Sequence, residues 1–301
     1  MEDYCLRVAA ANGQIRAFVA SSGHMVDKAA QVHNASAVAA AALGRALTAA
    51  AIMGLMADND NDTITLNIRG DGALGGVLAV SDGQGRVRGY THNPQVDVAN
   101  RPDGKLNVGG AIGSGYLTIA KDIGLKEPYT GKIALVSGEI AEDLAHYFAV
   151  SEQTPTIISL GVLVNPNLTI SHAGGLFLQL MPGFSDDLID KLEEQIANFP
   201  SISQILSEGK TPEDIAEILL APFKYEITEK MPIKFACNCD KPRIERALIS
   251  LGYKEISDII TEIGKAEINC HFCNTNYIFN KEDLEGILHA IRGGEAGGVD
   301  T

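Results

Sequence analysis

The chain has 301 residues, a formal net charge of −14 and a hydrophobic content of 46%. This composition allows a globular protein with at least one sizeable core, and the length favours two domains. The acidic balance argues against nucleic acid or an anionic membrane as a partner, because both are bound through clustered lysine and arginine.

Two features of the first 60 residues concern location. The N-terminal residues 1–5 are acidic and lack the basic start and apolar run of a secretory signal, so we expect a cytoplasmic protein without structural disulfides. Residues 35–57 carry one charge, Arg45, which would be costly at the centre of a membrane span. This segment is therefore predicted to be a buried helix of a soluble protein, with Asn34 or Ser36 as its N-cap.

The first ~180 residues alternate between β-type and helical segments, which predicts an α+β fold with a mixed N-terminal core domain over residues 1–183. A helix is expected over residues 140–148. The predicted strands are residues 15–19, 63–69, 76–80, 116–120, 132–136, 157–164 and 175–180.

Gly70-Asp71-Gly72-Ala73-Leu74-Gly75 matches the glycine pattern of a dinucleotide site, but a strand follows it where that site requires a helix. A tight connection between two strands is the better interpretation. The seven histidines are dispersed, and neither GxSxG nor HExxH occurs. The sequence therefore offers no enzymatic constellation, and we do not expect an enzyme.

Residues 184–230 predict an amphipathic helical linker. Apolar residues recur at helical spacing among acidic ones, and prolines and glycines then divide the segment into short helices. One helix should run over residues 212–220, with Thr211 as its N-cap. The apolar residues of the linker are Leu188, Ile189, Leu192, Ile196, Phe199, Ile215, Ile218 and Leu219.

Four of the five cysteines lie in a final module, residues 231–292, which a glycine-rich tail, predicted to be disordered, follows over residues 293–301. Cys237 and Cys239 form one close pair, and Cys270 and Cys273 form another after 30 intervening residues. Two spaced pairs are what a tetrahedral zinc ion requires, so we predict one Zn²⁺ per chain on these four sulfurs. His271 is a conceivable substitute ligand, although four cysteines already complete the shell.

The residue pattern by itself is compatible with more than one role for this site. A static zinc staple for a small domain is one interpretation, and a metalloenzyme is a weaker one, because a closed shell of four thiolates leaves no coordination position for a substrate. The module offers no basic face for nucleic acid, since it carries 8 Lys plus Arg against 9 Asp plus Glu.

The cysteine spacing, together with several short motifs, resembles the heat shock protein 33 family of bacterial redox-regulated chaperones. The matching motifs are Arg86-Val87-Arg88-Gly89-Tyr90, Gly115-Tyr116-Leu117-Thr118, Tyr129-Thr130-Gly131, Ile140-Ala141-Glu142-Asp143-Leu144, Tyr147-Phe148, Ser151-Glu152-Gln153, and Ala173-Gly174-Gly175 with Gln179 and Pro182. After Cys239 the chain departs from the family pattern, because Pro242 stands where the family often has glutamate.

The resemblance implies an ATP-independent holdase that is inactive while reduced and zinc-bound and binds unfolding proteins after oxidation. It also implies disulfides between neighbours, Cys237 with Cys239 and Cys270 with Cys273. Unfolding client proteins are the expected partners, and a homodimer is considered, especially after oxidation. The apolar residues of the linker are the client-binding candidates: we expect them to be buried at rest and exposed when the zinc module unfolds.

Overall fold

The computed structural model describes residues 2–296. The chain divides into two compact units, Met1–Ala236 and Cys237–Thr301, and each is described by itself.

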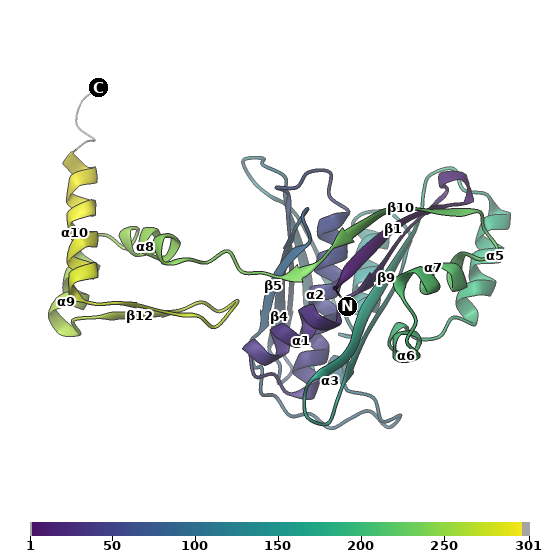
Figure 1. Ribbon diagram of the computed structural model, residues 1–301, viewed down its shortest axis with the longest axis horizontal. Helices are drawn as coiled ribbons and strands as arrows, with labels where there is room; N and C mark the ends of the chain where they lie inside the picture. Colours follow the sequence, from purple (N-terminus) through teal and green to yellow (C-terminus); the bar gives the residue numbers. More distant parts are fainter. Residues whose placement is uncertain (1, 297–301) are drawn as a thin grey trace. The chain divides into compact units, whose positions relative to one another are not determined.

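The first unit contains two β-sheets (Figure 1). One is a five-stranded antiparallel sheet in the order β10-β1-β2-β9-β8, formed by β1 (Tyr4–Ala10), β2 (Ile15–Ser21), β8 (Thr156–Val164), β9 (Ile170–Leu180) and β10 (Tyr225–Pro232). The other is six-stranded in the order β11-β5-β4-β3-β6-β7, formed by β3 (Thr63–Gly70), β4 (Gly76–Asp82), β5 (Arg86–Thr91), β6 (Gly115–Asp122), β7 (Tyr129–Ala134) and β11 (Lys234–Phe235). Its strands pair antiparallel except β11, which runs parallel to β5.

Helix α2 (Ala37–Leu55) lies in the core between the two sheets, beside α1 (Gly23–Val32). It begins at Ser36, whose hydroxyl accepts a hydrogen bond from the Ala39 amide. The helix is long and apolar enough to cross a membrane, but 94% of its apolar 18-residue stretch is buried within the fold. Its many alanines let both sheets approach closely, so the predicted buried helix is confirmed, with Ser36 as its N-cap.

The five-stranded sheet is covered on both faces. Along β2, Phe18 and Ala20 belong to the core that contains α2, whereas Ile15, Ala17 and Val19 belong to a second apolar cluster on the opposite face. Three short helices complete this second cluster: α5 (Asp186–Ala197), α6 (Ile202–Ser207) and α7 (Pro212–Leu220). The first unit is thus built in four layers, namely the six-stranded sheet, α1 with α2, the five-stranded sheet, and α5 to α7.

Two further short helices and one 3-10 turn complete the first unit: α3 (Val108–Ile112), α4 (Ala141–Val150) and the turn Ala11–Gly13. The buried carboxylate of Asp143 fixes the start of α4, because it accepts hydrogen bonds from the Val136, Ser137, Gly138 and Ile140 amides.

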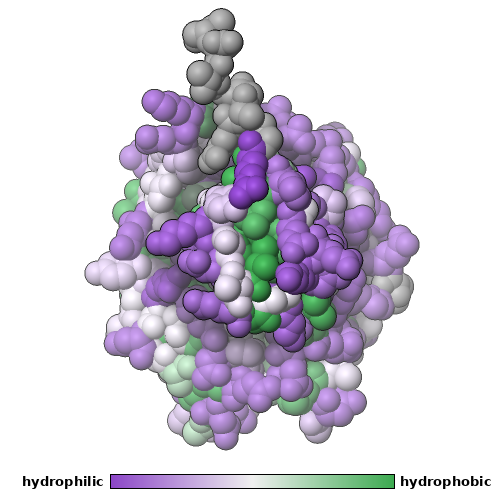
Figure 2. Space-filling model, turned by 90° about the vertical axis from the view of Figure 1, so that its left-hand side faces the viewer, coloured by the Kyte–Doolittle hydropathy of each residue, from purple (hydrophilic) through white to green (hydrophobic). Residues whose placement is uncertain are grey.

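The second unit is small. It contains helices α8 (Lys241–Ile249), α9 (Tyr253–Glu262) and α10 (Lys281–Ala296) and the hairpin of β12 (Ala266–Asn269) and β13 (Asn276–Phe279), and α10 packs against α8, α9 and β13. Its buried core residues are Leu248, Ile256, Phe279, Leu284, Ile287 and Ile291. The side of the molecule that lies on the left in Figure 1 is shown in Figure 2, where its surface is mostly hydrophilic with a narrow hydrophobic stripe.

The α+β prediction is confirmed, and all seven predicted strands overlap observed ones. The glycine motif at residues 70–75 connects β3 to β4, as expected of a tight β-connection. The helical linker was wrong at its end, because residues 225–230 form strand β10, which pairs with β1.

Two boundaries also differ from expectation. The second unit begins at Cys237 and not at residue 231, because Met231, Ile233 and Phe235 are buried in the core of the first unit. The disordered tail was wrong for residues 293–296, which belong to α10, while residues 297–301 lie outside the described residues.

Candidate metal centre

Cys237 and Cys239 lie on the segment between β11 and α8. Helix α8 begins immediately afterwards, because the Asp240 carboxylate accepts a hydrogen bond of 2.7 Å from the Arg243 amide and Pro242 stands in the first helical turn. The departure from the family pattern at Pro242 therefore leaves a well-capped helix. Lys241 forms an ion pair of 3.1 Å with Asp283 at the start of α10.

Cys270 and Cys273 lie in the turn between β12 and β13. The Cys270 carbonyl accepts hydrogen bonds from the Cys273 and Asn274 amides, and the Cys270 amide donates to the Thr275 carbonyl. Asn274 has a φ of 53°, a left-handed conformation that asparagine tolerates better than most residues. The tight turn directs both sulfurs to the same side of the hairpin.

The four sulfurs converge. Each Sγ atom lies within 4.8 Å of every other, with 3.7 Å between Cys237 and Cys270 and 3.2 Å between Cys239 and Cys273. For Zn–S bonds near 2.3 Å, the edge of a tetrahedron of sulfurs is about 3.8 Å. The donor set and its spacing therefore fit one tetrahedral ion, and His271 is not needed to complete it.

The pKa values of Cys237, Cys239 and Cys273 are shifted in different directions. Burial raises the pKa of Cys237 and of Cys239. At Cys273 burial acts in the same direction, but the Thr275 hydroxyl and the Cys239 sulfur outweigh it and lower the pKa to about 7. Cys273 therefore has more thiolate character near neutral pH than Cys237 or Cys239.

Two polar side chains that the sequence analysis missed contact the sulfurs. The Tyr277 hydroxyl donates a hydrogen bond of 3.1 Å to Cys239, and Thr275 Oγ1 lies 3.2 Å from Cys273 Sγ. Their positions two and four residues after Cys273 were visible in the sequence. Only the folded unit shows that Tyr277 reaches the other cysteine pair.

The client-binding candidates lie in α5, in α7 and just after α5. Leu188, Leu192, Ile215 and Leu219 are buried in the second apolar cluster, and Ile196 and Phe199 pack against it. Ile189 is half-buried and lies outside that cluster. The expected burial was wrong for Ile218, which is 41% exposed because it lies on the outer face of α7.

A polar contact holds α7 to the sheet beside this cluster. The Tyr4 hydroxyl on β1 donates a hydrogen bond to the Glu213 carboxylate on α7, and Lys230 on β10 forms an ion pair of 3.0 Å with the same carboxylate. The Lys230 ammonium also lies 3.7 Å from the centre of the Tyr4 ring. Thr211 caps α7 as predicted.

Comparison with known proteins covers nearly the whole chain. The family model described as Hsp33 protein matches residues 3–280. The 33 kDa chaperonins of Clostridioides difficile and Acetivibrio thermocellus are 49% and 48% identical to the chain, over 96% and 97% of its length and 99% and 98% of theirs.

A solved structure agrees as well. The crystal structure of the 33 kDa chaperonin of Thermotoga maritima, a heat shock protein 33 homologue, superposes with a TM-score of 0.89 at 36% identity and covers 97% of this chain and 100% of that one. On this family match, these identities and this shared fold, the chain belongs to the Hsp33 family.

Proposed function

We propose that the protein is a redox-regulated, ATP-independent chaperone of the cytoplasm, which holds unfolding proteins after oxidation and is inactive while reduced and zinc-bound. The observation that carries the proposal is the convergence of four cysteine sulfurs from two separate segments of one small unit. The names of the relatives, all 33 kDa chaperonins, support the holdase part of the proposal.

Zinc is the metal that fits best, because four sulfur donors at tetrahedral spacing select a soft or borderline ion. When bound, it would cross-link the hairpin to the segment before α8. Among the described side chains of this unit, six apolar residues are buried in its core, whereas structural zinc contributes roughly 10–16 kcal/mol of apparent binding free energy. Loss of the metal should therefore unfold the unit.

Oxidation removes the ligands. Two thiols and one molecule of hydrogen peroxide give one disulfide and two molecules of water, so two molecules of peroxide convert all four cysteines. We propose the pairing Cys237 with Cys239 and Cys270 with Cys273. All four sulfurs lie within 4.8 Å of one another in the reduced structure, so the partners of both proposed disulfides are already neighbours.

The connection from the zinc unit to the client-binding candidates is covalent and short. Cys237 follows Phe235 by two residues, and β11 and β10 lead back to α7. We propose that unfolding of the zinc unit loosens this connection and then the cover formed by α5 to α7. The apolar face of the five-stranded sheet and the apolar residues of the linker would then become available to clients.

Peroxide treatment tests the proposal against a static zinc staple. Reduced and oxidised samples are compared for released zinc and for their ability to suppress the aggregation of a thermally unfolding test protein. A redox-regulated holdase releases zinc and gains activity together. Zinc release without any gain in the suppression of aggregation would contradict the redox-regulated holdase and favour a zinc ion with a static structural role.

A further inference from the structure

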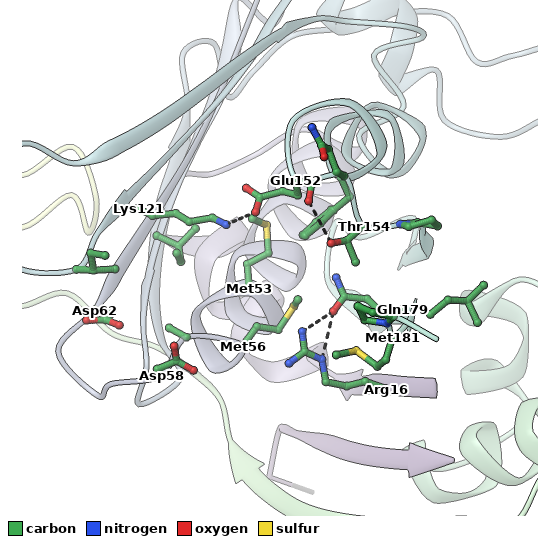
Figure 3. Close-up of a pocket in the computed structure, with 18 of the residues that line it drawn as sticks. Arg16, Met53, Met56, Asp58, Asp62, Lys121, Glu152, Thr154, Gln179 and Met181 are labelled. Atoms are coloured by element: carbon green, nitrogen blue, oxygen red, sulfur yellow. Dashed lines mark hydrogen bonds and ion pairs between the residues drawn. The ribbon is translucent and has the colours of Figure 1, made fainter. Parts of the chain in front are cut away.

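A pocket of about 550 Å³ opens in the first unit, far along the sequence from the cysteines. Several motifs that carry the family resemblance meet there without a role in metal binding, namely Phe148, Glu152, Gln153, Gln179 and Pro182. Its volume lies within the usual range for small-ligand sites. Figure 3 shows the polar and apolar side chains that line it.

One half of the pocket is apolar and adaptable. Met53 and Met56 from the end of α2 and Met181 after β9 line it, together with Phe148 and Ile64. Unbranched thioether side chains accommodate ligands of different shape with little strain. This half suits an extended or aromatic apolar group.

The polar half is organised around Arg16 on β2. Its guanidinium is half-buried and donates two hydrogen bonds, of 2.7 and 3.3 Å, to the side-chain oxygen of Gln179. Gln179 is only 2% exposed, and its amide nitrogen donates in turn to Thr156. A buried neutral amide thus fixes the direction of the guanidinium.

Among the described side chains, no carboxylate forms an ion pair with Arg16. The neighbouring Arg7 forms an ion pair of 2.9 Å with Glu229, and Lys121 forms one of 2.7 Å with Glu152. Burial and then the charge of Arg7 lower the pKa of Arg16, and Asp58 opposes this only from the exposed rim. A partly desolvated cation without an anion is unfavourable unless a ligand supplies the anion.

The other acids of the pocket do not fill this role. Asp62 accepts hydrogen bonds from the main chain and side chain of Asn59, and Glu152 accepts one from the Tyr147 hydroxyl besides pairing with Lys121. A free Nη group of Arg16 beside an apolar methionine surface is the arrangement that binds a carboxylate attached to an apolar body.

We propose that this pocket binds an apolar carboxylate, with the carboxylate on Arg16 and the apolar body on the methionine side. Two sources share this chemistry, a fatty acid and the free C-terminal carboxylate of a peptide that ends in a large apolar residue. The site does not depend on zinc, so it can be tested on the reduced, zinc-bound protein. Its failure would leave the redox proposal untouched, and the converse also holds.

The chain contains no tryptophan, so the fluorescence of a tryptophan peptide reports binding without background. The probes are a dipeptide, N-acetyl-leucyl-tryptophan, as its free acid and as its amide, and dodecanoate as a competitor. We expect the acid to bind at least about tenfold more tightly than the amide, as for a charge-assisted hydrogen bond. If dodecanoate displaces the peptide with a dissociation constant lower than that of the peptide acid, the fatty acid is the preferred ligand.

Three variants test the assignment to Arg16. Arg16→Gln should reduce binding of the acid to the level of the amide, and Arg16→Lys should restore part of it. Met181→Glu places a carboxylate beside Arg16 and should block the site without removing the cation. The matched control is Arg86→Gln, which removes one exposed arginine outside the pocket.

Equal affinity for acid and amide, or binding of the acid that survives in both Arg16→Gln and Met181→Glu, would overturn the proposal. So would the absence of binding of either carboxylate at millimolar concentration. Circular dichroism of each variant shows whether it is folded, and Met181→Glu keeps the test decisive if Arg16→Gln fails to fold.

Discussion

The Tyr277 hydroxyl donates a hydrogen bond of 3.1 Å to the sulfur of Cys239. Tyr277 belongs to the hairpin that carries Cys270 and Cys273, whereas Cys239 belongs to the segment before α8. The contact therefore joins the two cysteine pairs of the candidate metal centre independently of any bound ion. A donor to a thiolate also withdraws electron density from the sulfur and lowers its reactivity.

We predict that Tyr277→Phe makes the reduced protein lose zinc several-fold faster under peroxide, because Cys239 loses its donor. A chromogenic chelator measures the release. Tyr253→Phe is the matched control, since the Tyr253 hydroxyl lies in the same unit but accepts its hydrogen bond from Arg292 and not from a cysteine. Equal rates in the wild-type protein and the Tyr277 variant would show that the contact does not protect the sulfur.

The freshly reduced protein should contain one zinc per chain, and Cys270→Ser should contain markedly less, because three thiolates and a hydroxyl form a poorer shell. Metal analysis by mass spectrometry checks both. Cys5→Ala is the control: Cys5 is fully buried in the core of the first unit, and its removal should leave the zinc content unchanged.

Cys270 and Cys273 should form their disulfide before Cys237 and Cys239. The two-residue spacer suits disulfide geometry better than the one-residue spacer, and the pKa of Cys273 near 7 provides a thiolate at neutral pH. Peptide mapping of partly oxidised protein gives the order. Detection of the Cys237–Cys239 disulfide alone at early times would contradict this prediction.

The same acidity predicts a pH dependence. In the reduced, folded protein the first alkylation by iodoacetamide should fall on Cys273, and its rate should rise as pH increases through about 7, because the thiolate is the reacting form. The pKa values of Cys237 and Cys239 are raised by burial, so both should react only at higher pH. Mapping of the alkylated peptides at several pH values separates the sites.

Ile215→Ala should destabilise the first unit by about 2–5 kcal/mol, because Ile215 is fully buried on the inner face of α7. Ile218→Ala on the same helix is the control and should change stability by less than about 0.5 kcal/mol, since its side chain is exposed. Urea unfolding measures both. The Ile215 variant should also need less oxidant before it suppresses aggregation. An unchanged oxidant requirement would show that the stability of the cover formed by α5 to α7 does not control activation.

Hydrogen exchange tests the cover directly. After oxidation and zinc loss, protection should fall over residues 185–230 as well as in the zinc unit. Glu213→Gln should lower protection of α7 in the reduced protein, because it weakens the contacts with Tyr4 and Lys230. Unchanged protection over residues 185–230 in an oxidised sample that has gained activity would refute the mechanism.

Acid should act on the same contact. Burial acts to raise the pKa of Glu213, but the hydrogen bonds from Tyr4 and Lys230 outweigh it, so the folded pKa lies below the ordinary value of 4.5. Because its pKa is lower in the folded state, ionised Glu213 stabilises the folded protein above pH 4.5. This stabilisation is lost as the pH falls from 4.5 through the pKa of Glu213 in the folded protein. Protection of α7 should decline there in the wild type and much less in Glu213→Gln.

Local patterns predicted several elements and the clustering of the four cysteines. The alanine run gave α2, Thr211 and Pro212 gave the start of α7, and the cysteine spacing gave the four sulfurs, because each signal lies within a short stretch of sequence. Strand β10 was missed because the residues of Tyr225–Pro232 are mostly exposed at a sheet edge and show little apolar alternation. Its pairing with β1 depends on residues more than 200 positions away.

The pocket around Arg16 was beyond sequence analysis for the same reason. Arg16, Met53, Glu152 and Gln179 come from four elements or loops that meet only in the folded chain. The boundary at Cys237 also required the fold, because only tertiary packing shows that Phe235 belongs to the first core.

The cover on the five-stranded sheet has a consequence for selectivity. Helices α5 to α7 are joined by short connections to the strands on which they rest, so their effective concentration at that face is of millimolar order. A client that uses this face must compete with a tethered occupant of similar chemistry. The threshold for capture is then set by the local stability of the occupant and not by the intrinsic affinity of the sheet. Brief, small apolar exposures on folded proteins would lose this competition, and extensively unfolded chains would win it.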